Sequence, residues 1–408
     1  MLHEFAKFLQ DTALVERVRR SPKAFTRNRT LSLPRVAALM IASGMTCSVQ
    51  AELDEFFGQL SGQGVRTRTA SAQAFSKARQ GFSAELFDLA RDRLLELAKP
   101  HIDAARWNGL RPVAADGTRL HLPTRKNSAL RADHYAFALF LPGVELTLHA
   151  ALHPADGAER QMLFEALEVL TPGSDLLLLD RGFVGDAMVA ILTQRDIDFC
   201  MRVDMNCWKC VKEFARSGQS ERIVQVKAPA WRDALDYELE RSPSTVRLIR
   251  DVTPNGRVRI LMTSLLDSQR YPAESFGALY HRRWRVEEAF KRLKHRVGLE
   301  TVSGFNYLAL QQDFGARVLA DNLHTLLADL ASPGEPASFS RPNRVYALGA
   351  LRPILAGCLL GMRRLLKQLD NLLELISLTR CRIQPGRTYK RPPRKAKPHP
   401  HLAYKPAR

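Results

Sequence analysis

Four consecutive leucines, residues 176–179, constrain the fold of this 408-residue chain more than any other stretch. They stand between the turn residues Pro172 and Gly173 and the polar Asp180. A short apolar run bounded in this way is typical of a strand buried on both faces, in the middle of a parallel or mixed sheet. Because open α/β sheets place their sites at the carboxyl ends of strands, Asp180 is a candidate functional residue.

Strands and helices are predicted on both sides of this run. Residues 111–123 are expected to form a strand with Asp116 at its middle, and residues 134–153 a pair of strands around Pro142 and Gly143. Two helices and a further strand follow at 159–170, 186–194 and 199–203. The sequence therefore predicts an α/β core with a mixed sheet.

A second informative stretch runs from residue 280 to residue 294. Read as one helix, it brings Tyr280, Arg283, Glu287 and Lys294 within an arc of about 60°, beside an apolar stripe. One carboxylate then lies between an aromatic ring and two cations. Taken alone, such a charge run is most often a solvated helix face with Glu287 paired to the two cations, and this alternative stays open here.

Three acids stand out, namely Asp116, Asp180 and Glu287. Converging carboxylates repel each other unless a cation lies among them, and Mg²⁺ or Mn²⁺ takes hard oxygen ligands in this number. Two such ions can activate a water and stabilise the leaving oxygen of a phosphodiester in an in-line displacement. Each aspartate alone is more often a turn or cap residue. The three together, with their flanking residues, point to a metal site.

The composition indicates a polyanionic partner. The 61 Lys and Arg residues exceed the 42 Asp and Glu residues, which gives a formal net charge of +19 and points most often to nucleic acid. The chain starts without the basic-then-apolar order of a signal peptide, and its longest uncharged stretch, residues 36–51, is too short to span a bilayer. We therefore expect a soluble, intracellular protein with no membrane partner.

The first 105 residues are predicted to be helical, with candidate helices at 33–45, 49–60 and 71–79. The segment from Ser61 to Gly81 has no acid and contains four basic residues, namely Arg66, Arg68, Lys77 and Arg79. A helix, a glycine turn and a short basic helix resemble a helix-turn-helix, which predicts DNA contacts by Lys77 and Arg79. Plain helical packing is the alternative.

The motifs Asp116-Gly-Thr and Asp180-Arg-Gly-Phe, with the residues Tyr280, Arg283, Glu287 and Lys294, resemble the DDE transposases of bacterial insertion sequences. The resemblance is to the group named after insertion sequence four, whose glutamate helix reads Tyr, two residues, Arg, three residues, Glu, six residues, Lys. This spacing is met in full. The resemblance covers most of residues 30–300 and implies an RNase H-like fold.

The same resemblance implies roles for individual residues. Asp116, Asp180 and Glu287 are implied as catalytic ligands of two magnesium ions, for which manganese is a substitute. Water, then the freed 3′-hydroxyl, are implied as the nucleophiles of strand cleavage and strand transfer. Contacts to DNA are expected from Tyr280, Arg283, Lys294 and Arg181. For Arg283 and Lys294, the two cations of the helix motif, we expect these contacts at phosphates next to the cut.

In the same group a largely β insertion separates the second Asp from the Glu, and residues 205–271 fit that place. Strands are predicted within it at 221–227, 236–240, 245–251 and 258–264. Trp208 and Trp231 are candidates for stacking on a flipped base, with packing inside the insertion as the alternative. Cys207 and Cys210 have zinc or redox spacing, but no second pair completes a four-ligand site.

The predicted fold is an α/β, RNase H-like mixed-sheet core interrupted by this β-rich insertion, between helical N-terminal and C-terminal regions. The core is expected at 106–204 and 272–335, after the DNA-binding region 1–105 and before the helical region 336–380. Helices are predicted at 308–330 and 349–378, the second as a candidate dimer or synapsis surface. Residues 381–408, basic, rich in proline and free of acids, are expected to be a disordered phosphate-binding tail.

We therefore expect a DNA transposase that binds insertion-sequence ends and catalyses metal-dependent strand cleavage and transfer. Its expected partners are double-stranded DNA, as inverted-repeat ends and target, and a second copy of the chain in a synaptic homodimer. Its expected place is the bacterial cytoplasm, on the nucleoid. Two alternatives stay open: a catalytically silent DNA-binding protein of the same fold, and a metal-dependent DNA nuclease without end specificity.

Overall fold

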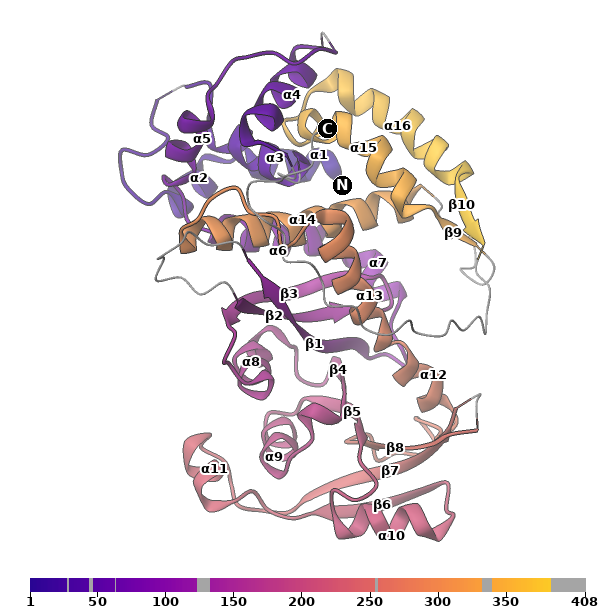
Figure 1. Cartoon of the computed structure of the whole chain (residues 1–408). Coiled ribbons are helices and arrows are strands. Elements are labelled where there is room, and N and C mark those ends of the chain that lie inside the picture. Colours follow the sequence, from indigo (N-terminus) through magenta and orange to yellow (C-terminus); the bar gives the residue numbers. More distant parts are fainter. Residues whose placement is uncertain are drawn as a thin grey trace. The chain divides into compact units, whose positions relative to one another are not determined.

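The computed structural model describes residues 1–27, 29–43, 47–62, 64–122, 133–253, 256–331 and 340–382. The chain divides into two compact units, both drawn in Figure 1. The helical unit contains Met1–Ala98, Leu120–His134 and Lys291–Arg408, and the sheet unit contains Lys99–Arg119 and Tyr135–Phe290. The predicted basic tail lies outside the described residues from residue 383 onward.

One eight-stranded sheet forms the core of the sheet unit, in the order β3-β2-β1-β4-β5-β8-β7-β6 (Figure 1). Its strands are β1 (Arg111–His121), β2 (Asp133–Leu141), β3 (Leu146–Pro154), β4 (Asp175–Leu179), β5 (Asp198–Val203), β6 (Glu221–Val226), β7 (Ser244–Val252) and β8 (Val258–Thr263). β4 runs parallel to β1 on one side and to β5 on the other, with Leu177 opposite Val113 and Phe199.

All five residues of β4 are fully buried, which confirms the central strand predicted from the four leucines. Two helices that follow strands also agree with the sequence, since α8 (Glu159–Ala166) and α9 (Asp186–Gln194) lie where helices were expected. The order β3-β2-β1-β4-β5, with β1, β4 and β5 parallel, is RNase H-like. The predicted α/β fold class is therefore confirmed.

The strands of the insertion extend the core sheet. β8 pairs antiparallel with β5, and β7 and β6 follow it, also antiparallel. Three of the predicted strands are confirmed, but the strand expected at 236–240 is wrong. The helix α11 (Trp231–Asp236) ends there, and Glu238 has a left-handed φ of 54°, which an extended strand does not contain. A further helix, α10 (Lys209–Ser217), precedes β6.

The stretch predicted as one helix over residues 280–294 is divided into three parts, which corrects that prediction. α12 (Ser275–His281) is followed by α13 (Trp284–Arg292) and then by η3 (Leu293–Val297), a π-helical turn. At the first break the Arg283 N–H donates to the Tyr280 carbonyl at 3.1 Å. This hydrogen bond spans three residues, as in a 3₁₀ turn, instead of the four that an α-helix spans. The break contains neither Gly nor Pro, so the helical spacing of the sequence gave no sign of it.

The helical unit is built from nearly all of the remaining helices. They are α1 (Leu2–Leu9), α2 (Thr12–Val18), α3 (Leu33–Ser43), α4 (Val49–Ser61), α5 (Ala72–Arg79), α6 (Glu85–Leu97), α14 (Tyr307–Leu330), α15 (Arg344–Leu359) and α16 (Arg363–Leu378). The prediction of a single helix at 349–378 is wrong, because the chain turns at Gly361, whose φ is 71°.

Within the described ranges, no helix combines the length and the apolar character needed to cross a membrane.

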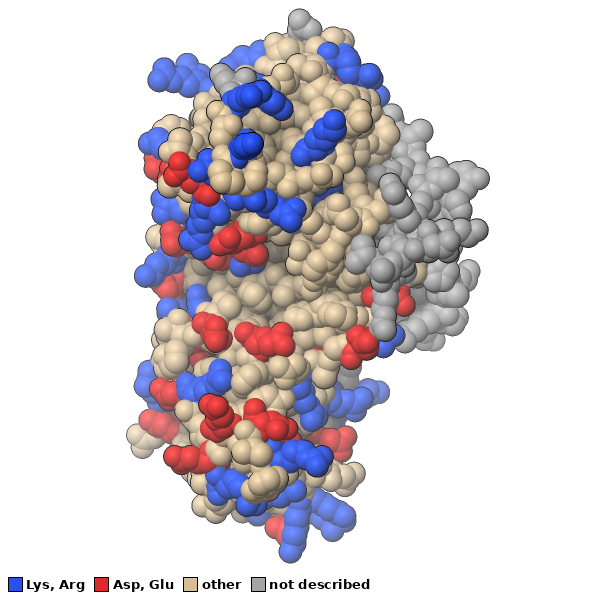
Figure 2. All heavy atoms as spheres, turned by 90° about the vertical axis from the view of Figure 1, so that its left-hand side faces the viewer, with Lys and Arg blue, Asp and Glu red and all other residues tan. Residues whose placement is uncertain are grey.

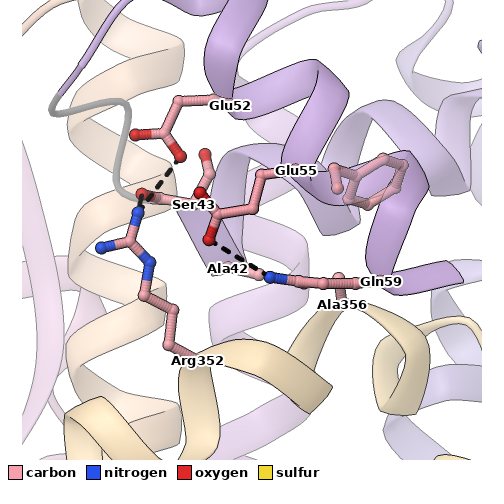
Figure 3. A pocket seen from close by; sticks show the side chains of 8 residues that line it. Ala42, Ser43, Glu52, Glu55, Gln59, Arg352 and Ala356 are labelled. Atoms are coloured by element: carbon pink, nitrogen blue, oxygen red, sulfur yellow. Dashed lines mark hydrogen bonds and ion pairs between the residues drawn. The ribbon is translucent and has the colours of Figure 1, made fainter. Parts of the chain in front are cut away.

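A buried ion pair joins the N-terminal and C-terminal helices of this unit (Figure 3). Glu52 on α4 is 2% exposed and accepts a hydrogen bond of 3.2 Å from Arg352 on α15. Arg352 also donates to the carbonyl of Ser43, the last residue of α3, at 3.2 Å. A cavity of about 10 Å³ lies beside the pair. Arg352, which interrupts an apolar run in the sequence, therefore ties three helices together.

For two glycines inside helices, substitution by alanine is predicted to have opposite effects on stability. A Cβ on Gly58 of α4 would lie 2.1 Å from the Val65 carbonyl oxygen, whereas a Cβ on Gly349 of α15 would meet no atom within 4 Å. We expect Gly58→Ala to lower the free energy of unfolding by about 1–3 kcal/mol. Gly349→Ala should raise it by about 0.5–1 kcal/mol, through higher helix propensity. Thermal unfolding followed by circular dichroism measures both; equal effects would contradict this packing.

Candidate active site

Asp116 lies near the middle of β1, next to the central strand. Its side chain is 22% exposed, and its Oδ1 accepts a hydrogen bond of 2.9 Å from the Gly117 N–H. Burial raises the pKa of this carboxyl to about 7. Arg283 and the Gly117 N–H oppose the rise in pKa, while the charges of Glu287 and Glu159 add to it. Asp116 is therefore surrounded by other charged groups.

Asp180 directly follows β4, at the carboxyl end of the central strand, as expected. Its Oδ1 accepts a hydrogen bond of 2.7 Å from the Gly182 N–H, which caps the short helix η2 (Arg181–Phe183). The register of β1 on β4 pairs Ala114 with Leu178. Continuing this register by two residues sets Asp116 beside Asp180, so two of the three predicted acids meet at one edge of the sheet.

Arg283 connects Asp116 to the third acid. Its Nη2 donates to Glu287 Oε1 at 2.9 Å, and its Nη1 lies 3.8 Å from Asp116 Oδ2. The residue is only 6% exposed, and its Nε is buried without a hydrogen-bond partner among the described residues. The break between α12 and α13 holds Arg283 at this point. One guanidinium thus supplies the positive charge shared by two carboxylates.

This arrangement fits a hard divalent cation by its donor chemistry. The described residues contain no group of three or more His, Cys, Asp or Glu side chains close enough to hold a metal ion. However, Asp116 and Glu287 already share one cation, the guanidinium of Arg283. Carboxylate oxygens that converge on a cation are the ligands that Mg²⁺ and Mn²⁺ prefer. Only Glu287 Oε1 and Asp116 Oδ2 face the guanidinium, so a metal ion would be held by these carboxylates beside Arg283 or in its place.

Tyr280 is buried beside the same group. It is the second-last residue of α12 and is 2% exposed, and its ring lies under the guanidinium of Arg259 at 5.0 Å from the ring centroid. Burial raises the pKa of Tyr280 to about 12, and the negative charge of Asp180 contributes to this rise. The phenol therefore stays neutral near pH 7 and can donate a hydrogen bond. The structure thus brings together five of the predicted residues, all in the sheet unit.

The other predicted site residues lie elsewhere or on the surface. Lys294 lies in η3, within the helical unit, and Arg181 is exposed in η2. Trp231 is 64% exposed at the start of α11, whereas Trp208 is half-buried before α10. Their contacts to DNA remain predictions. Cys207 is an exposed residue, but the protein around its sulfur atom shields it partly from water. This desolvation raises the pKa of Cys207 to about 11, so the side chain is a thiol at neutral pH.

The predicted DNA contact by Arg79 is corrected by the structure. Arg79 is 3% exposed, and its guanidinium donates to the side chains of Gln312 and Asp313, both at 3.0 Å. It therefore holds α5 against α14 and is not available to a phosphate. Lys77 on the same helix is exposed, and its contact to DNA stays a prediction. Sequence reasoning could not separate the two, because both are basic residues of one short helix.

Two residues near the acids were missed by the sequence reasoning. Glu159 is the first residue of α8, and it accepts a short hydrogen bond from the hydroxyl of Tyr135 on β2. Both lie in the sheet unit. Neither belongs to a motif of recognisable spacing. The only sequence signal was the position of Glu159 at the start of a predicted helix, which is also a common place for a capping acid.

An RNase H-like sheet with acids on two adjacent parallel strands, and a third acid on a following helix, defines a class of metal-dependent nucleic acid enzymes. Residues 107–323 match the family model described as the transposase DDE domain. The chain belongs to this family of DDE transposases.

Two individual proteins show similarity. Transposase InsG for insertion sequence element IS4, from Escherichia coli (strain K12), is 27% identical over an alignment 216 residues long, which covers 49% of this chain and 47% of InsG. The chain thus spans about half the length of this relative. A piggyBac transposase in a synaptic complex with hairpin DNA is similar over 91% of this chain and 85% of its own, with a TM-score of 0.47 and 10% identity. No functional conclusion follows from similarity at that level.

The shared guanidinium predicts a specific loss of stability. We expect Arg283→Met to lower the free energy of unfolding by about 1–3 kcal/mol at pH 8 in EDTA, because two partly buried carboxylates lose their counter-charge. Adding Glu287→Gln to this variant should restore part of the loss. The control is Arg285→Met, two residues away and 49% exposed at its side chain. Equal effects of the two single changes would contradict the electrostatic role of Arg283.

Proposed function

We propose that this protein is a DNA transposase that binds the ends of an insertion sequence and then cleaves and transfers DNA strands. Asp116, Asp180 and Glu287 are the proposed catalytic carboxylates. The observation that carries the proposal is the meeting of Asp116 and Asp180 at one sheet edge, with Glu287 joined to Asp116 through Arg283. Membership of the transposase DDE domain family supports it.

The three carboxylates would hold two Mg²⁺ ions, with Mn²⁺ as a substitute. When bound, such ions supply Lewis acidity that activates the attacking water or 3′-hydroxyl and stabilises the leaving oxygen. Asp116 has a raised pKa, so its ionisation near pH 7 is coupled to the arrival of a cation. No side chain needs to act as a nucleophile in this reaction.

Arg283, Tyr280 and Lys294 are proposed to bind the DNA next to the cut. The guanidinium of Arg283 is paired with Glu287 and Asp116. With a divalent cation held by these carboxylates, the guanidinium would be available to bind a phosphate through two parallel hydrogen bonds. The neutral phenol of Tyr280 lies close by and can donate to a phosphate oxygen. Arg181, exposed after Asp180, is proposed to extend this contact.

Binding along the DNA is proposed for the basic surface. Figure 2 shows Lys and Arg side chains spread over the part of the drawn face where the N-terminal helices lie. Lys77 is exposed on α5, while Arg68 pairs with Asp54 at 2.8 Å. The whole chain has a formal net charge of +19, so its affinity for DNA is proposed to fall as the salt concentration rises. Trp208 and Trp231 are proposed to stack on a flipped base.

A second copy of the chain is the proposed partner on DNA. α16 exposes Leu375 at 46% and Leu378 at 75% near its C-terminal end, which supports α16 as part of a dimer or synapsis surface. The proposed location is the bacterial cytoplasm, on the nucleoid, where the substrate DNA is found. The predicted basic tail, residues 381–408, is proposed to add sequence-independent phosphate contacts; from residue 383 onward it lies outside the described residues.

The proposal is tested with a supercoiled plasmid that carries the DNA flanking the gene. Purified protein and Mg²⁺ should break this plasmid at the ends of the inverted repeats, mapped to the nucleotide by primer extension. Asp180→Ala should give no breaks, because the site loses a ligand at the end of the central strand. Glu168→Ala, which changes an exposed acid of the sheet unit, should cut like the wild type.

Two other results would overturn the proposal in favour of the alternatives. Mg²⁺-dependent breaks at scattered positions, with no preference for the repeats, would identify a nuclease without end specificity. DNA binding without cleavage by the wild type, under conditions in which Mn²⁺ also fails, would identify a catalytically silent DNA-binding protein.

A further inference from the structure

A fourth acid, Glu159, lies at the edge of the sheet where Asp116 and Asp180 meet. It begins α8, and its carboxylate Oε1 accepts a hydrogen bond from the Tyr135 hydroxyl. Tyr135 lies on β2, the neighbour of β1 in the sheet. A tyrosine on the sheet thus fixes the position of a carboxylate that the helix presents.

The two glycines that follow the catalytic acids locate this carboxylate. A Cβ on Gly117, the residue after Asp116, would lie 3.0 Å from Glu159 Oε1. A Cβ on Gly182, two residues after Asp180, would lie 3.8 Å from Glu159 Oε2 and 3.0 Å from Asp180 Oδ1. The carboxylate of Glu159 therefore reaches from one acid motif to the other. At Gly117 a Cβ would also lie 2.2 Å from the Tyr135 ring, so glycine is needed there for this packing, whereas the 3.8 Å at Gly182 is ordinary van der Waals contact.

The next residue ties α8 to the turn that carries Asp180. Arg160 donates to the Gly182 carbonyl at 2.9 Å and to the Val184 carbonyl at 2.6 Å. These bonds hold the start of α8 against the Asp180 turn, while the bond from Tyr135 holds Glu159 toward β1. Both contacts constrain the same short segment. Glu159 is therefore fixed between two of the proposed metal ligands.

The charges at this edge are also coupled. Asp116 lies close enough to Glu287 and Glu159 for the charges of both carboxylates to act on it. Arg283 already supplies one cation to the acids, because it lies against Asp116 and Glu287. It is 6% exposed, and its Nε is buried with no hydrogen-bond partner among the residues that the structure describes. A cluster of this kind needs positive charge beyond one guanidinium.

We propose that Glu159 is a fourth carboxylate of the divalent-cation site, held in place by Tyr135, and that it strengthens cation binding by Asp116 and Asp180. This rests on the proposed function, since it adds a residue to the metal site of that function. Tyr135 is a positioning residue, because it acts through Glu159. The alternative is that the Tyr135–Glu159 bond only braces α8 against the sheet.

The test measures Mn²⁺ binding to the full-length protein without DNA, by electron paramagnetic resonance of free Mn²⁺. Glu159→Gln keeps the size and the hydrogen bond from Tyr135 but removes the charge. We expect it to weaken Mn²⁺ binding about tenfold, the lower end of what supporting groups of a metal site contribute. Tyr135→Phe should weaken it less, because the carboxylate remains. Glu168→Gln, a matched change on an exposed residue that follows α8, should leave Mn²⁺ binding unchanged.

The outcomes separate this inference from the proposed function. Asp116→Asn and Asp180→Asn report on the metal site itself, so they are measured beside Glu159→Gln. In one outcome, Asp116→Asn and Asp180→Asn both abolish Mn²⁺ binding, while Glu159→Gln binds Mn²⁺ like the wild type and only unfolds at a lower temperature. Glu159 is then a structural brace, so the inference is overturned while the proposed metal site stands. If the wild type shows no Mn²⁺ site that is sensitive to Asp116→Asn, the inference and the proposed metal site both fail.

Discussion

The parallel pairing of β4 with β1 is the constraint on which the candidate site depends. β4 is buried on both faces, and its register pairs Ala114 with Leu178. A slip by one residue would turn every side chain to the opposite face of the sheet. The register that buries the leucines is therefore also the one that sets Asp116 beside Asp180. Hydrophobic burial in one part of the strand positions the charged groups at its end.

Charge balance is the second constraint, and Arg283 satisfies it. Three or four carboxylates at one sheet edge destabilise the folded chain unless positive charge lies among them. The break between α12 and α13 holds a buried guanidinium against Asp116 and Glu287. In the proposed function the same guanidinium later binds a phosphate.

Features of the fold and site that depend on local sequence patterns were predicted correctly. Features that depend on contacts between residues far apart in the chain were not. The four leucines sufficed to place a central strand and Asp180 at its end. The break at Arg282 and Arg283 could not be predicted, because these residues favour helix as much as their neighbours do. Arg79 looked like a DNA-binding residue until Asp313, far along the chain, proved to be its partner. Glu159 was missed because its neighbours Gly117 and Gly182 are distant in the sequence.

The central claim is that Asp116, Asp180 and Glu287 hold divalent cations at one point. It is tested most directly by replacing Mg²⁺ with Fe²⁺ and generating hydroxyl radicals at the bound ion with ascorbate and peroxide, since the radicals cut the backbone only nearby. The cut positions are then read by mass spectrometry. The account predicts cuts near residues 116, 180 and 287 together, all suppressed by excess Mg²⁺. Cuts confined to other segments, or cuts at these three that Mg²⁺ does not suppress, would contradict it.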